Sequence, residues 1–205
     1  MKTLAKILSV GAIVSGSLLT SSVASADVSY NVGFVSEYYY RGIYQKNASA
    51  SAGIDYEQSG FYAGAWTADV GDGLEVDGYL GYGGEVGDFS YGVGFTGYYY
   101  TGDFDETYEE VNLSAGYGPV SIGYSIGEWD GDGGTDYDFL EVSIDLGAGF
   151  YGLYGSFGDE FDGDYFELGY GTTVSEIDLG VALIFPSDEL EGTDNAAVKA
   201  SRCLS

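Results

Sequence analysis

The residues of this chain that could do chemistry are mostly carboxylates, and many stand at every second position within apolar stretches. Glu75 and Asp77 are one such pair. Paired carboxylates could serve the acid–base chemistry of a glycosidase, or they could form a negative lining that favours cations. Because 33 of the 205 residues are acidic, such pairs are expected by chance. The spacing therefore favours a charged lining over a catalytic pair.

Other catalytic chemistries lack the side chains that they need. The chain has no histidine, which excludes Ser-His-Asp hydrolysis and zinc sites built on histidine. Its single cysteine, Cys203, lies near the C-terminus, where it makes a poor nucleophile or metal ligand, and it cannot form an internal disulfide. The sequence therefore predicts a protein that is not an enzyme and has no cofactor.

One acidic loop is a candidate for a metal site. Asp130, Asp132 and Asp136 are interleaved with glycines, and such a loop offers the oxygen ligands and sharp turns that Ca²⁺ requires. The loop lacks the full EF-hand pattern and its closing bidentate glutamate. A solvated loop is therefore the preferred interpretation, and calcium binding is the weaker alternative.

Positive charge is scarce, which draws attention to Arg41. Between residues 27 and 198 the only cations are Arg41 and Lys46. A guanidinium surrounded by carboxylates can pair with several of them and help fix how the first strand meets its neighbours. The alternative is a solvated arginine at the end of a strand.

Alternation of apolar residues with polar or small ones indicates the elements that position these side chains. The expected strands cover residues 28–34, 50–56, 61–68, 74–82, 89–95, 111–117, 120–126, 140–146, 150–157, 166–170 and 177–183. The facing of 61–68 and of 150–157 is ambiguous, because both sides are apolar. A twelfth strand from about residue 197 would make the number even, as it is in bacterial outer-membrane barrels.

The connections between these strands alternate between two kinds. Short turns are expected near residues 58–60, 85–88, 118–119, 147–149 and 174–176. Longer loops are expected near residues 42–47, 69–73, 101–107, 130–136, 158–164 and 186–196. This pattern predicts an all-β fold, a transmembrane antiparallel up-and-down β-barrel of about 12 strands, whose apolar face lipid would cover. A soluble secreted β-protein is the alternative.

The first 26 residues have the features of a secretory signal peptide. Lys2 and Lys6 precede an apolar core, and Ala24-Ser25-Ala26 forms a cleavage signal. We expect cleavage after Ala26, export, and a barrel over residues 27–205. The formal net charge of −27 includes both leader lysines, so the mature chain is still more acidic. This balance predicts no nucleic-acid partner.

If the apolar face points outward, the other face lines the interior. The expected pore-lining residues are Asp55, Glu57, Glu75, Asp77, Glu110, Glu141, Asp145, Glu167 and Asp178. The remaining inward positions are largely Gly and Ser, which predicts a narrow wet path that prefers cations. The alternative is that Tyr79, Tyr98 and Trp129 plug it. Clusters such as Tyr38-Tyr39-Tyr40 and Tyr98-Tyr99-Tyr100 are expected in aromatic girdles at the membrane interfaces.

Several short motifs stand in the first half of the mature chain. They are Ser36-Glu37-Tyr38 followed by Arg41-Gly42 and Gln45, then Gly53-Ile54-Asp55-Tyr56, Ser59-Gly60-Phe61-Tyr62-Ala63-Gly64-Ala65-Trp66, and the segment 74–82. Together they resemble the TorF family of porins, which are proteobacterial outer-membrane β-barrels. The likeness is good over about residues 28–100 and looser beyond. One departure is the C-terminus, Ser201-Arg202-Cys203-Leu204-Ser205, which lacks the terminal aromatic usual in such barrels.

The resemblance implies a location and a channel, and little chemistry. We expect a porin-like channel in the outer membrane of a Gram-negative bacterium, for passive diffusion of small hydrophilic solutes or ions, with a preference for cations. Its partners would be outer-membrane lipid, lipopolysaccharide and the barrel-assembly machinery. The alternative is a non-conducting structural or surface-interaction barrel whose acidic loops bind cations.

Overall fold

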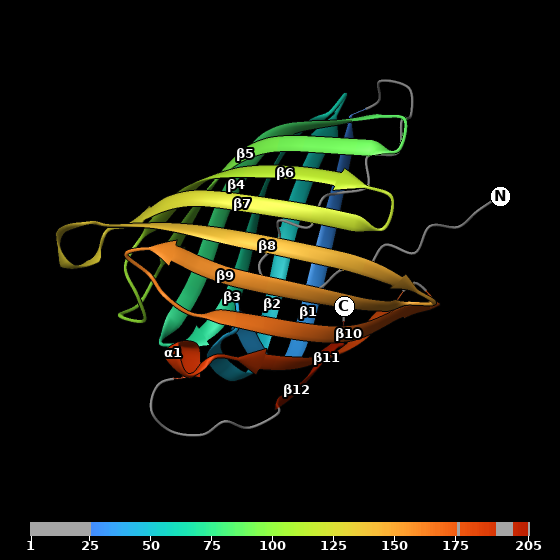
Figure 1. Cartoon of the computed structure of the whole chain (residues 1–205). Helices are drawn as coiled ribbons and strands as arrows, with labels where there is room; N and C mark the ends of the chain where they lie inside the picture. Colours follow the sequence, from blue (N-terminus) through green and yellow to red (C-terminus); the bar gives the residue numbers. More distant parts are fainter. Residues whose placement is uncertain (1–25, 176, 192–198, 205) are drawn as a thin grey trace.

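The computed structural model describes residues 26–175, 177–191 and 199–204, and the predicted leader lies almost wholly outside them. The described chain is built mainly of antiparallel strands that follow one another in chain order (Figure 1). They are β1 (Asp27–Tyr40), β2 (Ile43–Gln58), β3 (Phe61–Gly71), β4 (Gly73–Val86), β5 (Phe89–Tyr100), β6 (Tyr108–Tyr117), β7 (Val120–Trp129), β8 (Thr135–Gly147), β9 (Phe150–Asp159), β10 (Asp164–Val174), β11 (Ile177–Pro186) and β12 (Lys199–Leu204). Two short helical segments, η1 (Gly131–Gly133) and α1 (Asp188–Glu191), lie in the connections. None of the helices in these ranges is long and apolar enough to span a membrane.

Each strand pairs with the next along the chain, and the strand order is that of a closed barrel. The predicted up-and-down barrel of about 12 strands is therefore confirmed. The seam that closes it is short: β12 pairs with β11 from Lys199 to Leu204, but with β1 only through Leu204 and Cys203, opposite Phe34 and Val35.

The outer surface of the barrel is apolar, as the alternation predicts. At the middle of neighbouring strands, Val93, Leu113 and Ile126 are 49%, 44% and 53% exposed, whereas Asn112 and Ser125 on the opposite face are buried. The two ambiguous strands follow the same rule, because β3 buries Trp66 and β9 exposes Tyr154. A belt of this extent on a monomer marks a surface that contacts something apolar.

The five short turns lie where they are expected, but two of the longer loops do not exist. Residues 43–47 belong to β2, and β3 and β4 are separated only by Asp72. Arg41 and Gly42 join β1 to β2 with φ of 47° and 81°. Positive φ at both central residues is the geometry of a type I′ hairpin turn, which the twist of paired strands favours. The loop expected over 42–47 was therefore wrong, because Arg-Gly is a less obvious turn signal than Asn-Gly.

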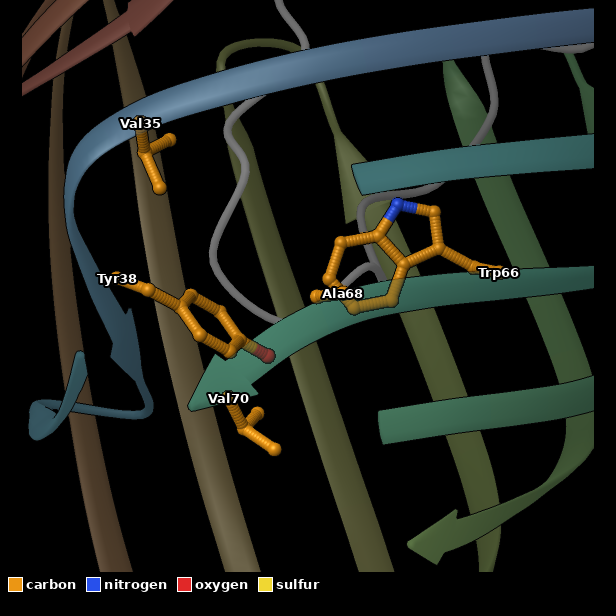
Figure 2. Close-up of a cluster of buried hydrophobic side chains, with 5 residues drawn as sticks. All are labelled: Val35, Tyr38, Trp66, Ala68 and Val70. Carbon is orange, nitrogen blue, oxygen red and sulfur yellow. The ribbon is translucent and has the colours of Figure 1, made fainter. Parts of the chain in front are cut away.

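The end of the β1–β2 hairpin lies inside the barrel. The register between β1 and β2 shifts between Tyr38 and Tyr39, where β2 carries one extra residue, Gln45. Figure 2 shows Tyr38 pointing from β1 toward Ala68 and Val70 of β3, and the rings of Tyr38 and Trp66 are 6.1 Å apart. Since β2 separates β1 from β3 in the sheet, this contact crosses the interior. We call residues 38–43 the inward turn.

Two apolar clusters surround the inward turn. The first consists of Val35, Tyr38, Trp66, Ala68 and Val70, shown in Figure 2. The second consists of Tyr39, Phe139, Tyr165 and Ile184, with Leu190 of α1 packed against it. Tyr38, Tyr39 and Tyr98 are thus buried inside rather than placed in an outer aromatic girdle. The girdle expectation was wrong for Tyr39 and Tyr98 because both stand at inward positions of the alternation, and it was wrong for Tyr38 because the end of the hairpin enters the interior.

Candidate functional site

A buried ion pair holds the inward turn. Arg41 is only 3% exposed. Its Nη1 donates a hydrogen bond to Oε2 of Glu110 and its Nη2 donates one to Oε1, both at 2.9 Å, and Nη2 also donates to Oγ of Ser125 at 3.1 Å. The fork of two parallel bonds is the strongest geometry for an arginine and a carboxylate. Arg41 is therefore not a solvated strand-end residue, and it pairs with one carboxylate across the barrel.

The other contacts of Glu110 satisfy its remaining hydrogen-bonding capacity. The hydroxyls of Tyr98 and Tyr137 donate to it at 2.7 and 3.0 Å, and Nδ2 of Asn112 donates at 2.9 Å. A buried carboxylate is tolerated when it is both paired and hydrogen-bonded. The Arg41 guanidinium also lies 4.2 Å from the centroid of the Phe139 ring, a favourable cation–π contact.

Gly42 lies where no larger residue fits. Its φ is +81°, and a Cβ atom built there would lie 2.6 Å from Cγ of Tyr165. The contact joins the tip of the β1–β2 hairpin to β10, which is separated from β1 in the sheet by β12 and β11. Gly42 thus allows both the turn and the close approach that brings Arg41 to Glu110.

Substitution of Gly42 by Ala is expected to destabilise the barrel by about 1–3 kcal/mol, because it adds a strained φ and a clash with the Tyr165 ring. Gly118→Ala is the matched control, since Gly118 also has a positive φ, +57°, but a Cβ there meets nothing within 4 Å. Urea titration of the detergent-refolded barrels measures the loss in free energy of unfolding for both variants. Equal losses in the two variants would show that backbone strain alone is responsible.

Tyrosine hydroxyls donate to most of the other interior carboxylates. Glu75 accepts hydrogen bonds from Tyr38 at 2.6 Å and from Tyr100 at 3.2 Å. Tyr79 donates to Asp55, and Tyr151 donates to Glu167 at 2.5 Å. Sequence reasoning missed these pairs. The usable signal was the occurrence of tyrosine at inward positions, as at Tyr79, whose ring reaches Asp55 of β2 across Gly64 of β3.

Tyrosine rings also cover glycines on neighbouring strands. A Cβ atom on Gly64 would lie 2.5 Å from the Tyr79 ring, and one on Gly169 would lie 2.0 Å from the Tyr151 ring. The small inward glycines therefore do not by themselves leave an open path through the barrel. Tyr79 and Tyr98 are in the interior, whereas Trp129 donates its indole N–H to Asp105 at 3.0 Å in the loop region. These positions agree with part of the plug alternative.

The nine expected pore-lining residues fall into three groups by exposure. Glu75, Asp77 and Glu110 are buried at 2%, 8% and 1% exposure. Asp55, Glu141, Glu167 and Asp178 are half-buried, and Glu57 and Asp145 are exposed. Asp145 and Asp178 serve turns: Asp145 accepts from the Gly147 amide at 2.7 Å, and Asp178 accepts from the Thr173 hydroxyl at 2.5 Å. For all nine residues, the role in lining a pore stays a prediction.

The motif residues gather at the inward turn. Tyr38, Arg41 and Gly42 are buried there, Ser36 and Glu37 precede it on β1, and Gln45 of β2 donates to the Ile43 carbonyl at 3.3 Å. The motif that carries the family resemblance is thus the segment that enters the barrel.

The loop proposed for calcium lies around η1. Asp130 and Asp136 are exposed, and the side chain of Asp132 is outside the described part of the chain. Within the described part, no three acidic, histidine or cysteine side chains come together in a way that could hold a metal ion. The calcium hypothesis gains no support from this geometry.

Comparison with protein families identifies the chain's relatives. The model of a family described as a bacterial protein of unknown function, Gcw_chp, matches residues 20–182, which include the inward turn and β1 to β10. The chain belongs to the Gcw_chp family. That description assigns no activity, so the porin label of the TorF resemblance is not carried by the match. No curated protein matches this Gcw_chp protein.

Solved structures with a similar arrangement are proteins of Pseudomonas aeruginosa, among them OpdK, which is described as an outer membrane protein. OccK2 (OpdF) in complex with glucuronate is 15% identical over 87% of this chain and 60% of its own, with a TM-score of 0.42. OccK9 (OpdG) is 14% identical over 78% and 53%, and OpdK with vanillate is 16% identical over 78% and 56%, both with a TM-score of 0.39. The Gcw_chp chain thus spans little more than half the length of these proteins. A likeness this distant assigns it no function.

Proposed function

We propose that this protein is an outer-membrane porin-like channel for passive diffusion of small hydrophilic solutes or ions, with a preference for cations. The observation that carries the proposal is that the same strands present apolar side chains outward and carboxylates inward around a closed barrel. Lipid is the apolar phase that would cover such a belt, and closure leaves no unpaired strand edge within it. The resemblance to the TorF porins supports the same function.

The location follows from the same proposal. Residues 1–26 would direct export and be removed after Ala26, and the barrel-assembly machinery would insert residues 27–205. Lipid and lipopolysaccharide would then surround the apolar belt. The barrel end that carries the five short turns would face the periplasm, as in other bacterial barrels.

The interior charge supports the preference for cations. Asp55, Glu75, Asp77, Glu141 and Glu167 lie inside the barrel, and Glu110 already neutralises Arg41. The other ion pair within the described residues is Lys46–Asp69, whose side chains are 24% and 42% exposed. The interior therefore carries a net negative charge, in a space where salt screens fields weakly.

A specific observation favours a second candidate, a non-conducting structural barrel. The inward turn reaches β6 and β7 through Arg41, and its two apolar clusters pack it against β3 on one side and against β8, β10 and β11 on the other. In this role the acidic loops would bind cations or bridge to lipopolysaccharide through divalent ions. Conductance separates the two candidates.

Single-channel recording in planar bilayers with an asymmetric salt gradient tests the proposal. We expect small conductance steps with a reversal potential of the sign for cations. A variant with Glu75→Gln, Asp77→Asn and Glu141→Gln together should lose most of that potential, because it removes interior charge. Neutralising the loop acids Asp130, Asp132 and Asp136 should matter less, and mainly at low salt. No conductance would favour the structural barrel, and anion selectivity would contradict the assigned charge of the interior.

A further inference from the structure

Asp77 is a buried carboxylate whose oxygen lacks a partner. It is 8% exposed, and its Oδ1 is buried and accepts no hydrogen bond from any described residue. This contrasts with Glu75, Glu110 and Glu167, which accept hydrogen bonds from tyrosine hydroxyls. A buried polar atom without a partner is rare in folded proteins and calls for an explanation such as a bound ion.

The surroundings of Asp77 make the missing partner a positive one. Glu75 and Glu110 are the charged groups that act on it most strongly, and both are carboxylates. The two Nη groups of Arg41 donate to Glu110 and Ser125, and neither Arg41 nor Lys46 forms an ion pair with Asp77 or Glu75. Both oxygens of Glu75 are occupied by tyrosine hydroxyls. A carboxyl group buried in this way is ionised at low cost only when such a counter-charge lies beside it.

We propose that Asp77, with Glu75 beside it on β4, forms a binding site for a monovalent alkali cation inside the barrel. The inference deepens the proposed channel function and rests on it for the role of the site, which would be a resting point for ions passing through.

The donor set selects the class of cation. Ca²⁺ takes six to eight oxygen ligands at about 2.3–2.6 Å, and Mg²⁺ keeps a near-octahedral set. Asp77 offers a free carboxylate oxygen, and Glu75 adds negative charge but no unoccupied oxygen. Two carboxylates of this kind fit a partly hydrated Na⁺ or K⁺, held weakly enough to leave again, as conduction requires.

The site has a reporter within reach. Trp66 on β3 is the register partner of Asp77, and Figure 2 shows its indole beside Tyr38, which donates to Glu75. The chain has two tryptophans, so Trp129→Phe leaves Trp66 as the only one. A cation bound at Asp77 is expected to change the emission of this indole.

The experiment is a titration of the full-length Trp129→Phe protein, refolded in detergent, with NaCl. Ionic strength is kept constant because the added NaCl replaces an equal concentration of N-methylglucamine chloride. We expect a saturable change in Trp66 emission in the millimolar range. Asp77→Asn, which keeps the shape of the side chain, should abolish it, and Glu75→Gln should weaken it about tenfold. Asp88→Asn, on the exposed β4–β5 turn, is the matched control and should leave it unchanged.

Each outcome decides the matter. No response to Na⁺, a response that persists in Asp77→Asn, or a response to CaCl₂ alone overturns the site. A barrel that conducts no current but keeps the Asp77-dependent Na⁺ response loses the channel function and keeps the site. A barrel that conducts current but shows no such response keeps the channel function and loses the site. Heat-modifiable migration in electrophoresis verifies that each variant is folded.

Discussion

Replacement of Arg41 by Met is expected to lower the free energy of unfolding by about 3–5 kcal/mol, the usual loss when one partner of a buried ion pair is removed. The substitution leaves the Glu110 carboxylate buried without its counter-charge, although Tyr98, Tyr137 and Asn112 still donate to it. It also removes the cation–π contact with the Phe139 ring. Urea titration of the refolded barrel, followed by tryptophan emission, measures the loss.

Two further variants show whether burial of the pair is the reason. Lys46→Met breaks the exposed pair with Asp69 and should cost less than about 1 kcal/mol. Adding Glu110→Gln to Arg41→Met should recover part of the loss, because the unpaired charge is then gone. An Arg41→Met variant no less stable than Lys46→Met would mean that the inward turn is not held by its ion pair. If the turn obstructs the pore, Arg41→Met should also enlarge the conductance steps.

Replacement of Leu113 by Arg is expected to destabilise the inserted barrel by about 2–4 kcal/mol. Leu113 is 44% exposed and lies near the middle of β6, where its neighbours in register are Val93 and Tyr124. A guanidinium at this depth would lie in hydrocarbon, far from the polar interfaces. Equilibrium unfolding of the protein inserted in lipid vesicles, with urea as denaturant, measures the effect.

Tyr117→Arg is the depth control for this substitution. Tyr117 is 67% exposed on the same face of β6, but at its end beside the Gly118-Pro119 turn, where a cation can reach the lipid headgroups. We expect a loss of about 0–1 kcal/mol there. Similar small losses at both positions, together with a monomer that stays soluble without detergent, would refute the membrane location, since a water-exposed arginine costs little at any height.

The strands and their facing could be predicted because both depend on a period of two residues. Val111, Leu113 and Ala115 point outward while Glu110 and Asn112 point inward, and nothing beyond local alternation is needed to say so. The same rule brought Glu75, Asp77 and Glu110 onto the inward face. Whether these carboxylates line a conducting path is a different question, which facing alone does not answer.

The inward turn could not be predicted in this way. Alternation along β1 places Tyr39 inside but Tyr38 outside, whereas both rings are buried because the end of the hairpin enters the interior. The partner of Arg41 is 69 residues away, on a strand that only the curvature of the whole barrel brings opposite. Scarcity of cations singled out Arg41 and favoured a carboxylate partner, but the identity of that partner is a property of the closed fold.

The large sequence separation between Arg41 and its partners also implies an order in which parts of the barrel form. The β1–β2 hairpin is made of neighbouring residues and can form early, whereas its tip docks on Glu110, Ser125 and Tyr165, which belong to β6, β7 and β10. Contacts that close such long loops form late, after most of the entropy of the chain has been lost. Arg41 can therefore be buried only after the later hairpins have joined the sheet. During refolding, protection of its backbone amide from hydrogen exchange should lag behind protection of the amides of β1 and β2.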